Sequence, residues 1–98
     1  MIPYGRQDIQ ESDMAAVANV LKSDFLTQGP VVPQFEQVVS ESCGARHAVA
    51  VNSATSALHI ALLALEVGHG DLVWTSPNTF VATSNAALYC GASIDFVD

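Results

Sequence analysis

Basic residues are scarce in this chain of 98 residues. Ten acidic residues stand against three basic ones, and the formal net charge is −7. The three basic residues, Arg6, Lys22 and Arg46, lie far apart in the sequence. Nucleic acids and anionic membrane surfaces are bound by clustered lysine and arginine. We therefore expect neither a nucleic acid nor a membrane as a partner.

Cysteine is also scarce, and Cys43 and Cys90 are the only two. They do not form the close-spaced pair that zinc sites and redox motifs require. A disulfide framework in so short a chain would contain more cysteines. The sequence thus predicts two reduced thiols packed in the core of a cytoplasmic protein.

Long apolar runs are missing too. The N-terminal segment MIPYGRQDIQE has no apolar signal core. The uncharged stretch 72–94 contains Pro77 and several polar residues, which argue against a membrane span. Half of the residues are nevertheless hydrophobic, so we expect residues 1–98 to form a packed part of one domain.

Two helices are predicted at the N-terminal end. Met14, Val17, Ala18 and Leu21 recur at helical spacing, and this helix should end near residues 23–24. The loop 25–30 follows. A second helix should begin near Pro33 and end at Gly44, which is a suitable C-cap.

Strands and helices alternate in the rest of the sequence. Apolar runs predict strands at 47–51, 72–75 and 93–97, with helices at 54–66 and 79–90 between them. This order predicts an α/β fold with a mainly parallel sheet. Three strands are few for such a domain, so the sheet should be incomplete.

The segment Asn52–Ala57 lies where the first predicted strand passes into a helix. A helix N-terminus offers free N–H groups and the positive end of its dipole, which suits a phosphate. Ser53, Thr55 and Ser56 add hydroxyls. The alternative is an ordinary N-terminal cap, since serine and threonine are common there. Spacing alone leaves both interpretations open.

The segment Thr75–Phe80 is the equivalent turn after the second predicted strand. In a parallel sheet it should lie at the same edge as the first turn. Phe80 could stack on a flat ligand ring. It could also pack into the core beside Trp74, and the residues alone favour this second interpretation.

Three groups of residues resemble the DegT family of nucleotide-sugar aminotransferases. They are Leu26-Thr27-Gln28-Gly29-Pro30 with Phe35-Glu36, Asn52-Ser53-Ala54-Thr55-Ser56-Ala57-Leu58 through Gly68-x-Gly70-Asp71, and Pro77-x-Thr79-Phe80-Val81-Ala82-Thr83. The segments Trp74–Phe80 and Tyr89–Ala92 favour the subgroup that acts in pseudaminic acid synthesis. The resemblance covers essentially the whole chain.

The resemblance implies the N-terminal part of an aspartate-aminotransferase-like large domain, fold type I, with pyridoxal 5'-phosphate as cofactor. By resemblance, Thr55 and Ser56 would hold the cofactor phosphate and Phe80 would stack on its ring. The sugar-nucleotide site would be lined by Tyr4, Asp24, Phe25, Leu26, Thr27 and Ala54. The family's full-length members form homodimers.

The implied reaction moves an amino group from an amino acid, with glutamate expected, to C4 of a UDP-linked 4-keto-6-deoxy sugar. Such sugars serve surface polysaccharides or flagellin glycans. The family's Schiff-base lysine lies downstream of these residues. Lys22, the only lysine here, matches no position that the family uses, so this chain alone is expected to be inactive. The alternatives are a non-catalytic binding or dimerising module and another fold-type-I enzyme.

Overall fold

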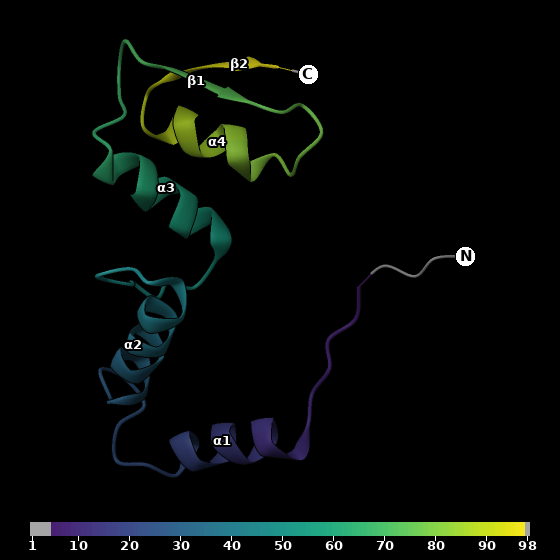
Figure 1. Ribbon diagram of the computed structural model, residues 1–98, viewed down its shortest axis with the longest axis vertical. Helices are drawn as coiled ribbons and strands as arrows, with labels where there is room; N and C mark the ends of the chain where they lie inside the picture. The colour runs from purple at the N-terminus through teal and green to yellow at the C-terminus, as the bar shows by residue number, and fades with distance from the viewer. Residues whose placement is uncertain (1–4, 98) are drawn as a thin grey trace. The chain divides into compact units, whose positions relative to one another are not determined.

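The computed structural model describes residues 5–97. It divides into two compact units, Met1–Ala50 and Val51–Asp98, and each is described separately. The helices and strands, labelled in Figure 1, are α1 Glu11–Leu21, α2 Val31–Cys43, α3 Ala54–Ala64, β1 Leu72–Thr75, α4 Ala82–Tyr89 and β2 Ser93–Phe96.

The N-terminal unit contains the two predicted helices. At the start of α1, the carboxylate of Asp13 accepts the N–H of Gln10 at 2.9 Å, which satisfies a donor that the helix itself leaves free. Gly44 ends α2 as predicted, with φ at +64°, a conformation that glycine adopts without steric penalty. Within residues 5–97, no helix has both the length and the apolar character that a bilayer crossing requires.

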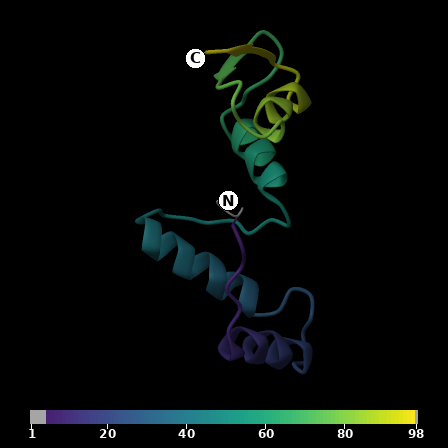
Figure 2. The ribbon, with the colours of Figure 1, turned by 90° about the vertical axis from the view of Figure 1, so that its right-hand side faces the viewer.

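The C-terminal unit contains β1 and β2, which pair in parallel from Leu72 opposite Ser93 to Thr75 opposite Phe96. Helix α4 connects the two strands and packs on them, and α3 packs on α4. Figures 1 and 2 both show α4 between the strand pair and α3. The predicted parallel sheet and its helical crossover are confirmed.

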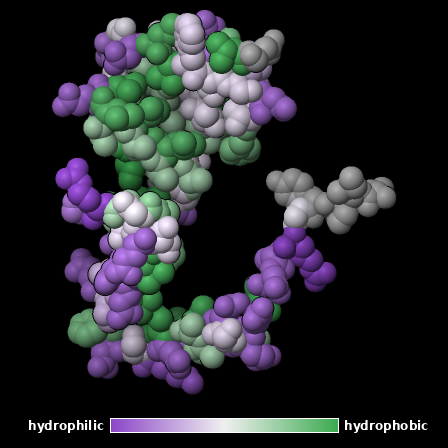
Figure 3. Space-filling model, viewed as in Figure 1, coloured by the Kyte–Doolittle hydropathy of each residue, from purple (hydrophilic) through white to green (hydrophobic). Residues whose placement is uncertain are grey.

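The core of this unit is built from small residues. Its buried members are Ala82, Ser84, Ala86, Ala87 and Ala92, and all but Ala92 lie on α4. Alanine lets the helix approach the strands closely. The large apolar side chains are only partly covered by the described residues, and Trp74 remains 65% exposed. Figure 3 shows hydrophobic surface gathered over this unit.

One predicted element is wrong. Residues 47–51 do not form a strand, and the chain from residue 45 to residue 53 is neither helix nor strand. Their apolar composition fits a strand, but a strand also requires a neighbour with which to exchange hydrogen bonds. Among residues 5–97, β1 and β2 pair with each other, and no other strand is available.

Because the core is built from small residues, we expect the free energy of unfolding to depend strongly on the volume of its side chains. Ala87 is fully buried, so Ala87→Leu should lower the free energy of unfolding by about 1–3 kcal/mol through overpacking. Ala64→Leu places the same side chain at an exposed helical position and should change it by less than about 0.5 kcal/mol. Urea unfolding of the full-length protein measures both. Equal effects would show that the alanine layer does not limit packing.

Candidate functional site

The first turn of α3 is the better defined of the two candidate turns. Ser53 is the N-cap, with an extended backbone (φ −158°, ψ 153°), and its Oγ accepts the N–H of Ser56 at 3.2 Å. The predicted cap is therefore present. A cap satisfies one of the free amides of a helix end and leaves others open, so it does not exclude anion binding.

The hydroxyls of this turn form a chain of hydrogen bonds. Ser53 Oγ lies 2.9 Å from Ser56 Oγ, and Ser56 Oγ donates to Asn52 Oδ1 at 3.1 Å. Because a hydroxyl has one proton, Ser56 directs its proton to Asn52 and accepts from Ser53. Asn52 was not among the predicted site residues. Its place directly before the serine cap was the signal, since asparagine often bonds to nearby polar groups.

Two amides at the start of α3 remain available. The N–H groups of Ala54 and Thr55, and the hydroxyl of Thr55, have no hydrogen-bond partner among residues 5–97. They lie at the positive end of the helix dipole, where an anion is favoured. This donor set can meet a phosphate while Ser53 Oγ still accepts the N–H of Ser56.

The turn after β1 carries Phe80 in the same unit. Ser76 Oγ accepts the N–H of Asn78 at 3.2 Å, and the hydroxyls of Thr79 and Thr83 lie 3.3 Å apart. The Phe80 side chain is 77% exposed, and Trp74 is 65% exposed. The interpretation that Phe80 packs into a core beside Trp74 is therefore wrong within the described residues, and its ring is free to meet a ligand.

The loop after α1 lies in the N-terminal unit. Ser23 Oγ shares its single proton between the carbonyl oxygens of Val20 at 2.7 Å and Phe25 at 3.2 Å, which ties the loop to the end of the helix. All four predicted substrate residues of this loop, Asp24–Thr27, are exposed. A small cavity of about 110 Å³ lies against it, lined by Val20, Phe25, Leu26, Gln28, Gly29, Val31 and Val32. Tyr4 lies outside the described residues.

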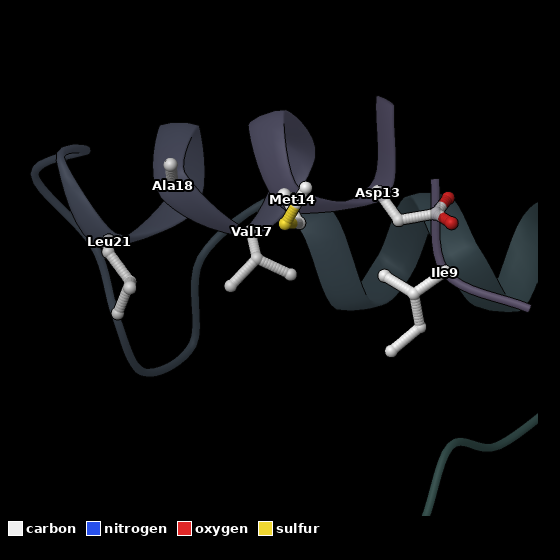
Figure 4. Close-up of a pocket in the computed structure, with 6 residues that line it drawn as sticks. All are labelled: Ile9, Asp13, Met14, Val17, Ala18 and Leu21. Atoms are coloured by element: carbon white, nitrogen blue, oxygen red, sulfur yellow. The ribbon is translucent and has the colours of Figure 1, made fainter. Parts of the chain in front are cut away.

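A larger groove lies on α1. It has a volume of about 600 Å³ and is lined by Ile9, Asp13, Met14, Val17, Ala18 and Leu21. Figure 4 shows that Ile9, Val17 and Leu21 point to the same side. Four of the lining residues, Met14, Val17, Ala18 and Leu21, are the apolar stripe that the helical spacing predicted. Within the described residues the groove is an uncovered helix face and contains none of the predicted site residues.

Comparison with known proteins decides which family these turns belong to. The model of the DegT/DnrJ/EryC1/StrS aminotransferase family matches residues 7–98. The chain belongs to this family.

Three relatives illustrate the similarity. The chain is 47% identical over 98 residues to the UDP-4-amino-4,6-dideoxy-N-acetyl-beta-L-altrosamine transaminase of Campylobacter jejuni, covering 100% of this chain and 26% of that protein. Helicobacter pylori PseC, an aminotransferase of pseudoaminic acid biosynthesis, matches with 36% identity and a TM-score of 0.89 over 97% of this chain and 26% of that one. The PLP form of Spr1654 from Streptococcus pneumoniae gives 35% identity and a TM-score of 0.90 over 99% and 25%.

This family member therefore has the fold of the N-terminal part of fold-type-I sugar aminotransferases, as the sequence predicted. It spans about a quarter of the length of the curated relatives that it matches.

Gly29 gives a test of the loop. A Cβ at this position would lie 2.9 Å from the carbonyl oxygen of Phe25, which is backbone and cannot rotate away. Gly29→Ala should therefore shift the loop and lower the free energy of unfolding by about 1–3 kcal/mol. At Gly68 the nearest atom would be 3.8 Å away, so Gly68→Ala is the matched control and should cost less than about 0.5 kcal/mol. Thermal unfolding of the full-length protein compares the two; similar losses would contradict the close approach.

Proposed function

We propose that this chain is the N-terminal part of the large domain of a pyridoxal-phosphate-dependent sugar aminotransferase. The parent enzyme transfers an amino group from an amino acid, for which we propose glutamate, to C4 of a UDP-linked 4-keto-6-deoxy sugar. The product serves pseudaminic acid or another surface glycan. The observation that carries this proposal is the 47% identity, over every residue of the chain, to a transaminase whose name specifies a UDP-amino sugar.

The α3 turn supports the cofactor part of the proposal. The unpartnered amides of Ala54 and Thr55 and the hydroxyl of Thr55 form a set of neutral donors at a positive helix end. That chemistry fits the phosphate of pyridoxal phosphate. The hydroxyl of Ser56 is the fourth donor once it turns from Asn52 toward the anion. Bound pyridoxal phosphate supplies an electron sink for the transfer of the amino group.

Phe80 supports the placement of the cofactor ring. Phe80 is a large aromatic side chain, 77% exposed in the turn after β1, so its ring offers a surface on which a flat ligand can stack. We propose that Phe80 stacks on the flat ring and restricts its tilt. The stacking also shields one face of the ring from water.

The substrate side of the proposal rests on the loop residues. We propose that Asp24, Phe25, Leu26 and Thr27, with Ala54 and Tyr4, line the sugar-nucleotide site, and that the parent enzyme is a homodimer. The loop residues are exposed and held by the hydrogen bonds of Ser23. Lys22, the only lysine, is the C-cap of α1. We therefore propose that the amino-transfer step requires a lysine beyond these residues and that the chain alone does not catalyse it.

The first test places a negative charge at the α3 turn. In the full-length enzyme, Ser56→Asp should weaken pyridoxal phosphate binding by more than about a hundredfold, because the carboxylate repels the phosphate and competes for its amide donors. Ser12→Asp makes the same change in the first turn of α1 and should leave the affinity unchanged. Cofactor dissociation is followed by absorbance. Full retention of the cofactor by Ser56→Asp would show that the phosphate does not bind at this turn.

The second test concerns the aromatic ring. Phe80→Ala should weaken cofactor binding by about tenfold, because it removes the stacking surface. Phe80→Trp should retain the cofactor, since its ring can also stack. Leu88→Ala removes an exposed apolar side chain from α4 of the same unit and serves as the control. If the cofactor dissociates from Phe80→Ala and Leu88→Ala at the same rate as from the parent enzyme, Phe80 does not contact the ring.

A further inference from the structure

The side chain of Glu36 reaches from α2 to a backbone group fourteen residues later. Its Oε1 accepts the N–H of Ala50 at 2.8 Å, and the contact is partly buried. Ala50 is the last residue of the N-terminal unit. A hydrogen bond to a charged acceptor is stronger than one between neutral groups. A partly buried carboxylate is therefore used to hold main chain at the point where this unit ends.

The segment that Glu36 holds has little other support. Of the backbone N–H groups between Arg46 and Ser53, the one of Ala50 is alone in having a hydrogen-bond partner among residues 5–97. The segment also has no strand neighbour there. Backbone donors in folded proteins are nearly always paired. Within the described residues, the carboxylate of Glu36 is thus the one group that holds an N–H of this segment.

The held residue lies close in sequence to the candidate cofactor turn. Ala50 precedes Asn52, which accepts the hydroxyl of Ser56, and Ser53, which caps α3. The Ser53 cap requires an extended backbone conformation at that residue. If the chain before them were free, binding of an anion would have to order it first, and that ordering lowers affinity.

We propose that Glu36 is a positioning residue for the α3 turn: its carboxylate fixes the chain at Ala50 so that Asn52 and Ser53 enter the turn already ordered. This role rests on the proposed function, because the ligand of the turn is the phosphate of pyridoxal phosphate. Glu36 itself does not contact the cofactor. It acts through the main chain of residues 50–53.

The test uses the full-length enzyme and three variants. Glu36→Leu removes the acceptor at similar volume, and Glu36→Gln keeps an oxygen that can accept. Glu41→Leu is the matched control, since Glu41 lies on the same helix and is exposed, and its carboxylate accepts only from the Gln37 side chain at 2.9 Å among the described residues. Two quantities are measured: amide hydrogen exchange in residues 46–53, and the affinity for pyridoxal phosphate by absorbance.

We expect Glu36→Leu to accelerate exchange at Ala50 by at least about tenfold and to weaken cofactor binding by about tenfold. Glu36→Gln should largely restore both, which a purely structural loss of packing would not explain. Glu41→Leu should change neither. If Glu36→Leu loses helical circular dichroism, Glu36→Ala replaces it as the variant without an acceptor.

Two results would overturn the role of Glu36. Unchanged exchange at Ala50 in Glu36→Leu would show that the hydrogen bond does not hold the segment. Faster exchange with unchanged cofactor affinity would show that it holds the segment without serving the turn, and the proposed function would stand. If the unmutated parent enzyme binds no pyridoxal phosphate, the proposed function is overturned. In that case the exchange measurement still shows whether Glu36 holds Ala50.

Discussion

The hydrogen bond from the Ser56 amide to the Ser53 hydroxyl is the contact on which the candidate site depends. It starts α3 at Ala54 and decides which donors of the helix end are satisfied internally. The chain of hydroxyls from Ser53 through Ser56 to Asn52 then fixes the direction of each proton. The amides of Ala54 and Thr55 stay open as a result. The serine cap, which in the sequence was an alternative to a phosphate-binding turn, is thus compatible with the proposed phosphate site.

Local signals in the sequence were sufficient for most of the fold. Gly44 marked the end of α2 correctly, because only its φ of +64° matters there and no distant contact is needed. The run from Leu72 to Thr75 was predicted as a strand and is one. The run 47–51 has the same apolar character and is not. The difference is a partner: β1 has β2 beside it, whereas 47–51 has none among the described residues, and composition carries no information about partners.

The candidate site was predictable to a similar extent. The helix start at Ser53 was predicted correctly because a helix start following an apolar run is a local pattern, and the roles of Thr55 and Ser56 stay predictions. The exposure of Phe80 was not, since the residues alone favoured a packed ring beside Trp74 and exposure depends on what surrounds a side chain in space. The contact of Glu36 with Ala50 was also missed, because it joins residues fourteen apart through a backbone donor that no side-chain pattern reveals.

The buried alanines of α4 determine how little side-chain entropy this unit loses when its core packs. An alanine methyl has no rotamers to lose, so burial of Ala82, Ala86 and Ala87 costs no side-chain entropy. The residues that do have rotamers, such as Trp74 and Phe80, remain exposed and keep their freedom in the described residues. The side-chain entropy of this unit therefore remains in its exposed large residues, aliphatic ones such as Leu65 included, and any partner that covers them must supply the free energy to immobilise them.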